Sequence, residues 1–174
     1  GRDVPSPVQL AALSVSGSQT ALVVSDVVIR GDTVGLMCGR DGSLWVLRSL
    51  IQNSSVGIDS LGCNRLVVEQ SIVLGNRSLG LRIGTGTRQY RVINNVCNGN
   101  GQSAGGYGVA IATGVSGLFS YNTILNNGEA GIDGGAVRCE LGGTTTRAIE
   151  SSIVIQNAMS RRQDASGQPL GSQF

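Results

Sequence analysis

Phe119-Ser120-Tyr121-Asn122-Thr123-Ile124 is one copy of a block that occurs six times along this chain. Each copy has an apolar residue at both ends and two mostly polar residues in the middle. The copies are Val23–Val28, Val46–Ile51, Val68–Val73, Val92–Cys97, Phe119–Ile124 and Ile149–Val154. Successive copies begin 23, 22, 24, 27 and 30 residues apart. A repeat of this length is typical of a solenoid, in which each repeat forms one coil.

The residues around each block predict β-strands. Ala21 and Val23, like Leu44 and Val46, are apolar at a spacing of two, which is typical of a strand with one buried face. The central pair, such as Ser25-Asp26, is typical of a turn, and the apolar residue that closes the block, such as Val28, is expected inside. A second strand is expected behind a glycine at Gly35–Cys38, Gly57–Ser60, Gly80–Ile83, Gly108–Ile111 and Gly131–Gly134, and an incomplete first coil at Ala12–Val15.

The two segments Asn94–Gly101 and Tyr121–Gly128 resemble the repeat of right-handed parallel β-helix proteins, the pectate-lyase-like superfamily. The resemblance covers roughly residues 12–157 and implies an all-β, single-stranded parallel β-helix of about six coils with 22–30 residues each. It does not specify an activity, because this superfamily includes polysaccharide lyases, hydrolases, epimerases, adhesins and phage spikes. The rival architecture is an antiparallel sandwich of short strands, which has no need of identical repeats.

The composition excludes several kinds of chemistry. Histidine and lysine are absent, so imidazole bases, histidine metal ligands, Schiff bases and Ser-His or Cys-His pairs are excluded. The net charge of +2 comes from scattered arginines without a basic stripe, so nucleic acid is not expected as a partner. No stretch approaches the roughly 18 apolar residues of a membrane-spanning helix.

The candidate catalytic residues belong to one predicted file on the outer face of the second strand, which consists of Met37, Asp59, Arg82, Ala110 and Asp133. Asp59 and Arg82 are expected one coil apart, as a surface ion pair. Asp59 and Asp133 are expected three coils apart, about 14 Å, whereas the two carboxylates of a glycosidase lie about 5 to 9.5 Å apart. No metal site is expected, and Ca²⁺ enters only if the protein is a lyase.

Trp45 and Tyr107 are the aromatic residues best suited to stack on a sugar ring, and Trp45 is expected to face outward between inward Leu44 and Val46. The turn asparagines, by contrast, are expected to form stacked amide ladders rather than a sugar site.

The four cysteines lack the paired spacing of a zinc site. Cys38 and Cys97 are expected in the core. Cys63 and Cys139 are expected in the returning turns. Cys38 and Cys63 are expected on neighbouring coils, so they are the pair that could form a disulfide.

We expect residues 1–159 to form the β-helix, with an incomplete first coil, and residues 160–174 to form a polar tail or cap. The expected function is a non-catalytic scaffold or recognition domain, directed at carbohydrate. The alternative is a polysaccharide lyase or glycoside hydrolase that uses Asp59, Arg82 and Asp133. The resemblance implies a larger, secreted or cell-surface bacterial protein. The partners expected are a polysaccharide, the rest of a larger polypeptide, and a second copy stacked end to end.

Overall fold

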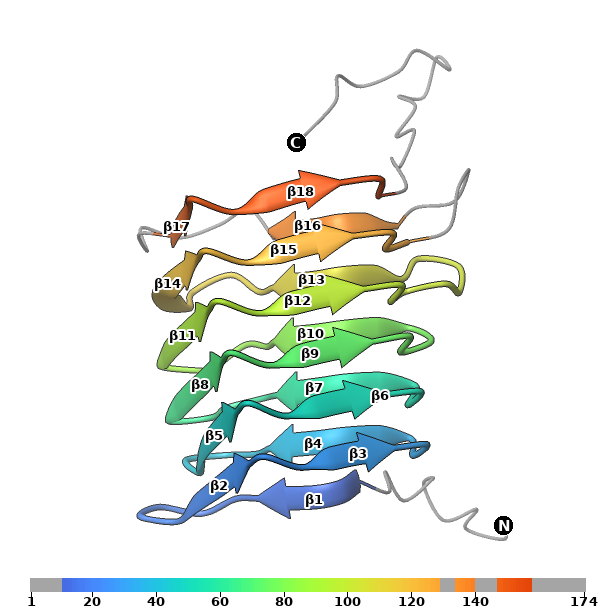
Figure 1. The fold of residues 1–174 in the computed structure, drawn as a ribbon. Coiled ribbons are helices and arrows are strands. Elements are labelled where there is room, and N and C mark those ends of the chain that lie inside the picture. Colours follow the sequence, from blue (N-terminus) through green and yellow to red (C-terminus); the bar gives the residue numbers. More distant parts are fainter. Residues whose placement is uncertain (1–10, 129–133, 140–146, 158–174) are drawn as a thin grey trace, which may run out of the picture.

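The computed structural model describes residues 11–128, 134–139 and 147–157. In these residues every strand pairs in parallel with its equivalent one coil away, so the strands form three parallel sheets of six strands each (Figure 1). This arrangement is a parallel β-helix with three strands per coil. The antiparallel sandwich is therefore excluded.

We name the sheets A, B and C in the order in which the chain visits them. Sheet A contains β1 (Ala11–Val15), β4 (Val34–Cys38), β7 (Val56–Ser60), β10 (Leu79–Ile83), β13 (Tyr107–Ile111) and β16 (Gly135–Cys139). Sheet B contains β2 (Ala21–Ser25), β5 (Ser43–Leu47), β8 (Arg65–Glu69), β11 (Gln89–Ile93), β14 (Ser116–Ser120) and β17 (Arg147–Glu150). Sheet C contains β3 (Val28–Arg30), β6 (Leu50–Gln52), β9 (Ile72–Leu74), β12 (Val96–Asn98), β15 (Thr123–Leu125) and β18 (Ile153–Ile155).

The core is a column of aliphatic side chains inside the three sheets. Each sheet contributes its inward residues, for example Ile58 from sheet A, Leu66 from sheet B and Val73 from sheet C, and all three are fully buried. Phe119 is the largest fully buried side chain. Because each coil covers the coil before it, apolar burial accumulates coil by coil along the axis.

The corners repeat as regularly as the strands. At the corner between sheets B and C, every coil has one residue with a left-handed backbone, at Asp26, Arg48, Gln70, Asn94, Tyr121 and Ser151. The corner between sheets C and A has an equivalent residue at Gly31, Asn53, Gly75, Gly99, Asn126 and Gln156. The predicted polar turn is therefore confirmed in coils two to six.

The predicted register is wrong by one residue in the first coil. Val24, not Val23, pairs with Val46, and Val24 is 4% exposed whereas Val23 is 62% exposed. The shift continues through the corner, so Ile29 takes the buried position that was predicted for Val28. The first repeat is accordingly 22 residues, as shown by the bond from the Val27 amide to Ser49.

Candidate functional site

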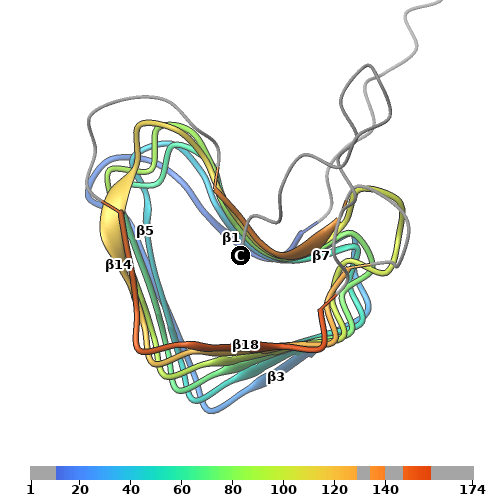
Figure 2. The same ribbon diagram turned by 90° about the horizontal axis from the view of Figure 1, so that it is seen from above.

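The candidate catalytic residues predicted from the sequence belong to the outer face of sheet A. Seen along the axis, sheet A is bent, and its outer face lies on the concave side between two rows of turns (Figure 2). The residues along its centre are Ser14, Met37, Asp59, Arg82, Ala110 and Arg138. The file is therefore continuous over six coils, and the first four predicted members are in place.

The fifth predicted member, Asp133, is not in this file. Strand β16 pairs Arg138 with Ala110, so an arginine occupies the position expected for the aspartate. Ala136 likewise takes the place that the repeat assigned to Gly131. Asp133 itself lies outside the described residues. The outer face thus carries one carboxylate and two guanidinium groups.

Asp59 and Arg82 form a bidentate ion pair between neighbouring coils. The Arg82 Nε–H donates to Asp59 Oδ1 at 2.7 Å, and the Arg82 terminal nitrogen donates to Oδ2. The Asp59 side chain is 1% exposed and that of Arg82 is 37% exposed. The pair is therefore not the surface pair that the sequence predicted, because its carboxylate is buried. The hydrogen bond that Arg82 donates to the Asp59 carboxylate raises the pKa of Arg82 above its usual value.

Three of the other four acidic side chains that the structure describes are also bound by an arginine. Asp26 pairs with Arg48, Asp41 with Arg88 and Glu69 with Arg91. The fifth acidic side chain that the structure describes, Asp32, accepts the amide of Thr33. Among the described residues, no group of three or more metal-ligating side chains is found.

Asp26 illustrates the effect of such a pair on an exposed carboxylate. Arg48 donates to both carboxylate oxygens, at 2.8 and 2.7 Å, and Ser25 donates at 2.6 Å. These bonds, those from Arg48 above all, lower the pKa of Asp26 to about 2. This carboxylate is ionised at neutral pH and is poorly suited to donate a proton.

The two candidate aromatic residues lie in different settings. Trp45 lies on the outer face of sheet B and is half-buried, between Val23 and Val67 in register. Tyr107, at the start of β13, is buried, and the Arg138 guanidinium lies 5.5 Å from the centre of its ring. Trp45 is therefore the better placed of the two to meet a ligand.

The turn asparagines form two ladders, as predicted. At the corner between sheets B and C the ladder contains Ser49, Ser71, Asn95, Asn122 and Ser152. At the corner between sheets C and A it contains Ser54, Asn76, Asn100, Asn127 and Asn157. Each side-chain oxygen accepts the backbone amide of the equivalent residue one coil earlier, at 2.9–3.5 Å. These amides serve the backbone and are not available to a sugar.

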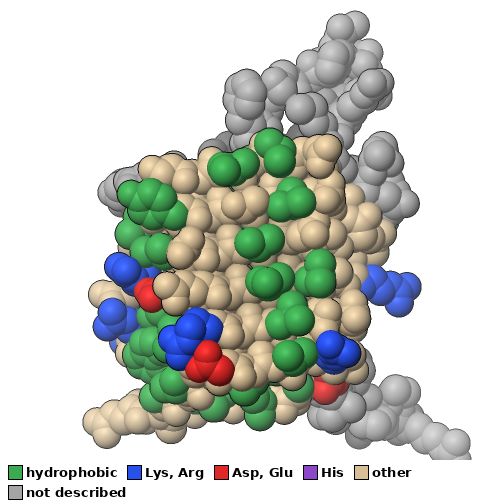
Figure 3. Space-filling view, in the orientation of Figure 1, with side chains coloured by type: hydrophobic (Ala, Val, Ile, Leu, Met, Phe, Trp, Pro, Cys, Tyr) green, Lys and Arg blue, Asp and Glu red, His purple; other side chains and the backbone are tan. Residues whose placement is uncertain are grey.

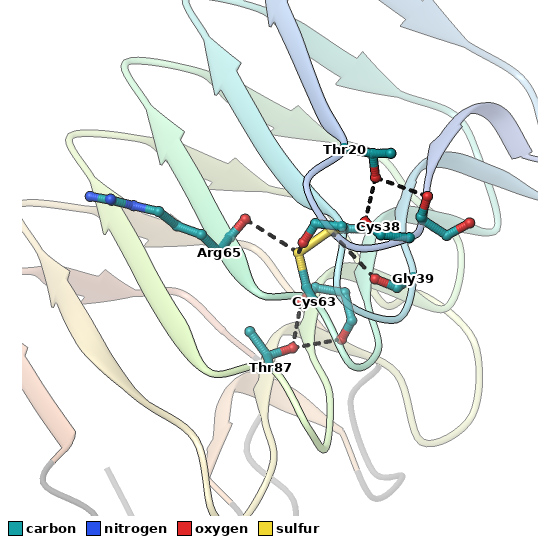
Figure 4. Close-up of a disulfide and its surroundings, with 10 residues drawn as sticks. Thr20, Cys38, Gly39, Cys63, Arg65 and Thr87 are labelled. Atoms are coloured by element: carbon teal, nitrogen blue, oxygen red, sulfur yellow. Dashed lines mark hydrogen bonds between the residues drawn. A yellow bond between two sulfur atoms is a disulfide. The ribbon is translucent and has the colours of Figure 1, made fainter.

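The predicted bridge between Cys38 and Cys63 is present as a disulfide, with the two Cα atoms 5.5 Å apart (Figure 4). It joins the end of β4 to the turn of the next coil. The Cys63 sulfur lies 3.3 Å from the Arg65 carbonyl oxygen, which is a contact and not a hydrogen bond because an oxidised sulfur has no proton. Cys97 and Cys139 are thiols, and burial raises the pKa of Cys97 to about 12.

The fold defines this protein as a parallel β-solenoid. The sequence model of the right-handed β-helix region family matches residues 8–161, and the chain belongs to that family. No curated protein and no solved structure matches the chain significantly. Within the described residues there is no helix long and apolar enough to cross a membrane.

Proposed function

We propose that this β-helix is a non-catalytic recognition scaffold of an exported protein, and that carbohydrate is its ligand class. The observation that carries the proposal is the pairing of the acidic side chains. Four of the five that the structure describes are bound by an arginine of another coil. A general acid for glycoside cleavage needs a raised pKa and a second carboxylate nearby, and Asp59 in the centre of the concave face has an arginine there instead.

The disulfide supports the exported setting. Cys38 and Cys63 are both fully buried, and such bridges form and persist in oxidising compartments such as the periplasm or the cell exterior. A bacterial cell surface, and a larger polypeptide around this domain, are the setting in which we place the scaffold.

The carbohydrate site of this proposal is the outer face of sheet B around Trp45. An indole ring offers a flat apolar surface with a polar edge, which suits the face of a sugar ring. The ion pair of Arg91 with Glu69 lies on the two following strands of the same face and supplies donors and acceptors for hydroxyl groups. Both elements are fixed on strands rather than on loops.

Binding to a panel of neutral and acidic polysaccharides, measured by calorimetry, tests the proposal. We expect Trp45→Ala to weaken binding at least about tenfold, which corresponds to 1.4 kcal/mol, and Trp45→Phe to retain most of it. Asp59→Asn should leave the affinity unchanged. The same panel is assayed for new reducing ends and for unsaturated products, with Ca²⁺ and with a chelator. Turnover that Asp59→Asn abolishes would establish the lyase or hydrolase alternative.

A further inference from the structure

The outer face of sheet C is an apolar surface with no role in the proposed sugar site. In each of its three-residue strands the middle residue points into the core, and the first and third residues point outward. Eight of these twelve outward positions are aliphatic: Val28, Leu50, Ile72, Leu74, Val96, Leu125, Ile153 and Ile155. Val28, Ile72, Ile153 and Ile155 are 43–56% exposed. They appear as columns of apolar side chains on the face toward the viewer (Figure 3).

Charge is nearly absent from this face. Among its twelve outward positions only Arg30 is charged, and the Arg30 guanidinium donates to the Gln52 side-chain oxygen. The outer face of sheet B, by contrast, carries Arg65, Glu69 and Arg91. Contiguous apolar patches of this kind on soluble proteins mark interaction surfaces.

The strands of sheet C have the same length in every coil. The two ladder positions that bracket each strand are five residues apart in every coil, as in Ser49 and Ser54 or Asn122 and Asn127. The coil nevertheless lengthens from 22 residues between Ser49 and Ser71 to 30 between Asn122 and Ser152. None of the added residues lies between the two ladder positions, so the strands of sheet C keep three residues in every coil.

We propose that this face is the interface through which two copies of this chain pair face to face. A second copy has the same strand spacing of about 4.8 Å, so its rows of outward side chains can meet those of this face strand by strand. A two-fold axis parallel to the solenoid axis places the strands of both copies at equal heights. The aliphatic files of the two sheets then interdigitate, as in an aligned sheet-on-sheet packing.

The size of the face sets the strength of this pairing. Six strands at about 4.8 Å and three residues at about 3.3 Å give an outline of roughly 300 Å² per copy. A standard stable interface buries about 800 Å² per partner. The dimer is therefore a weak, reversible one, which forms at high protein concentration or when the chain is concentrated on a surface.

Sedimentation velocity on the full chain over a wide concentration range tests this inference. We expect the wild type to pass from monomer to dimer as the concentration rises. Ile72→Asp puts two charges in the middle of the interface of each dimer, and it should weaken the dimer at least tenfold. Ile155→Asp, in the other file of the face, should act in the same direction. Val23→Asp is the matched control, since Val23 is 62% exposed on the outer face of sheet B, and it should leave the dimer intact.

Circular dichroism melts at low concentration verify that each variant is folded. A wild type that stays monomeric throughout the range would overturn the inference. A dimer that Ile72→Asp and Ile155→Asp leave unchanged would overturn it as well, because it would point to end-to-end stacking through the terminal coils. Loss of sugar binding by Trp45→Ala with the dimer intact would separate this inference from the proposed function.

Discussion

The outer faces of sheets A and C are built from the same repeat but differ in what their side chains do. On sheet A the central file is bound into the molecule, since Asp59 of one coil is held by Arg82 of the next and Arg138 lies over Tyr107. On sheet C four of the eight outward aliphatic side chains are exposed, and the other four are half-buried. The difference teaches that a position in a groove does not make a residue reactive. Side chains that bind a neighbouring coil contribute to the stability of the fold. Exposed side chains without such a contact can pack against another molecule.

The largest expected effect is on sheet A, at Gly80. A Cβ on Gly80 would lie 2.9 Å from Cγ of Asn100 in the ladder, and it would also collide with the Gly108 carbonyl oxygen. Gly80→Val should therefore lower the free energy of unfolding by about 3 kcal/mol or more. Ala110→Val, on the outer side of the next strand, is the control and should change it by about 0.5 kcal/mol at most. Equal losses in urea titrations of the two variants would contradict the register.

Removal of the Cys38–Cys63 disulfide should cause the second largest loss of stability. The disulfide closes a loop with a sequence separation of 25 residues, for which chain entropy gives a stabilisation of about 3 kcal/mol. The double variant Cys38→Ser/Cys63→Ser should unfold at a correspondingly lower urea concentration. Reduction should have the same effect on the wild type and none on the double variant. A wild type indifferent to reductant would show that the bridge does not form.

Asp59→Asn should cost about 1–2 kcal/mol, because it leaves Arg82 without its charged partner while solvent still reaches part of the guanidinium. Ile72→Thr on sheet C should cost about 0.5 kcal/mol at most, because Ile72 is exposed in the monomer. Thermal melts at low concentration compare the two. If Ile72→Thr were the more destabilising change, the contrast between the faces would be wrong.

The smallest effect concerns pH and the exposed pair of Asp26 and Arg48. The pKa of Asp26 is about 2 in the folded protein, below its ordinary value of 3.8. A depressed carboxyl pKa adds stability that is complete above the ordinary value and is lost as the pH falls toward 2. Asp26→Asn should remove this part of the acid dependence while the melting temperature at neutral pH falls only slightly. An unchanged acid dependence would show that the pair contributes nothing.

Much of this fold can be predicted from the sequence, because six copies of one pattern constrain each other. The errors occur where the pattern is ambiguous. Ala21–Val24 is apolar at four consecutive positions, so alternation alone does not say whether Val23 or Val24 points inward. Near residue 135 two segments fit the second strand, one at Gly131 and one at Ala136, and the pairing of β16 selects the second.

The site was harder to predict than the fold for a physical reason. The strand register places Asp59 beside Arg82, and the spacing of the repeat predicts this neighbourhood. The burial of the Asp59 carboxylate depends on how neighbouring side chains cover it, which strand spacing does not encode. The apolar outer face of sheet C consists of the residues on either side of each closing residue, such as Ile72 and Leu74 beside Val73. The repeat predicts that the closing residue is buried, but it assigns no role to these two neighbours.

The β-helix requires coils stacked in register, and a second disulfide tests this stacking most directly. Ser60 pairs with Cys38 in register, and Thr87, like Cys63, lies two residues before the next strand of sheet B. The Ser60 and Thr87 hydroxyls are 2.6 Å apart and form a hydrogen bond. This bond lies one coil further along the axis, at the position equivalent to the Cys38–Cys63 disulfide. The measurement is the intact mass and peptide map of Ser60→Cys/Thr87→Cys after air oxidation. We expect a second bridge that joins the two new cysteines, whereas two freely reactive thiols at these positions would contradict the stacking.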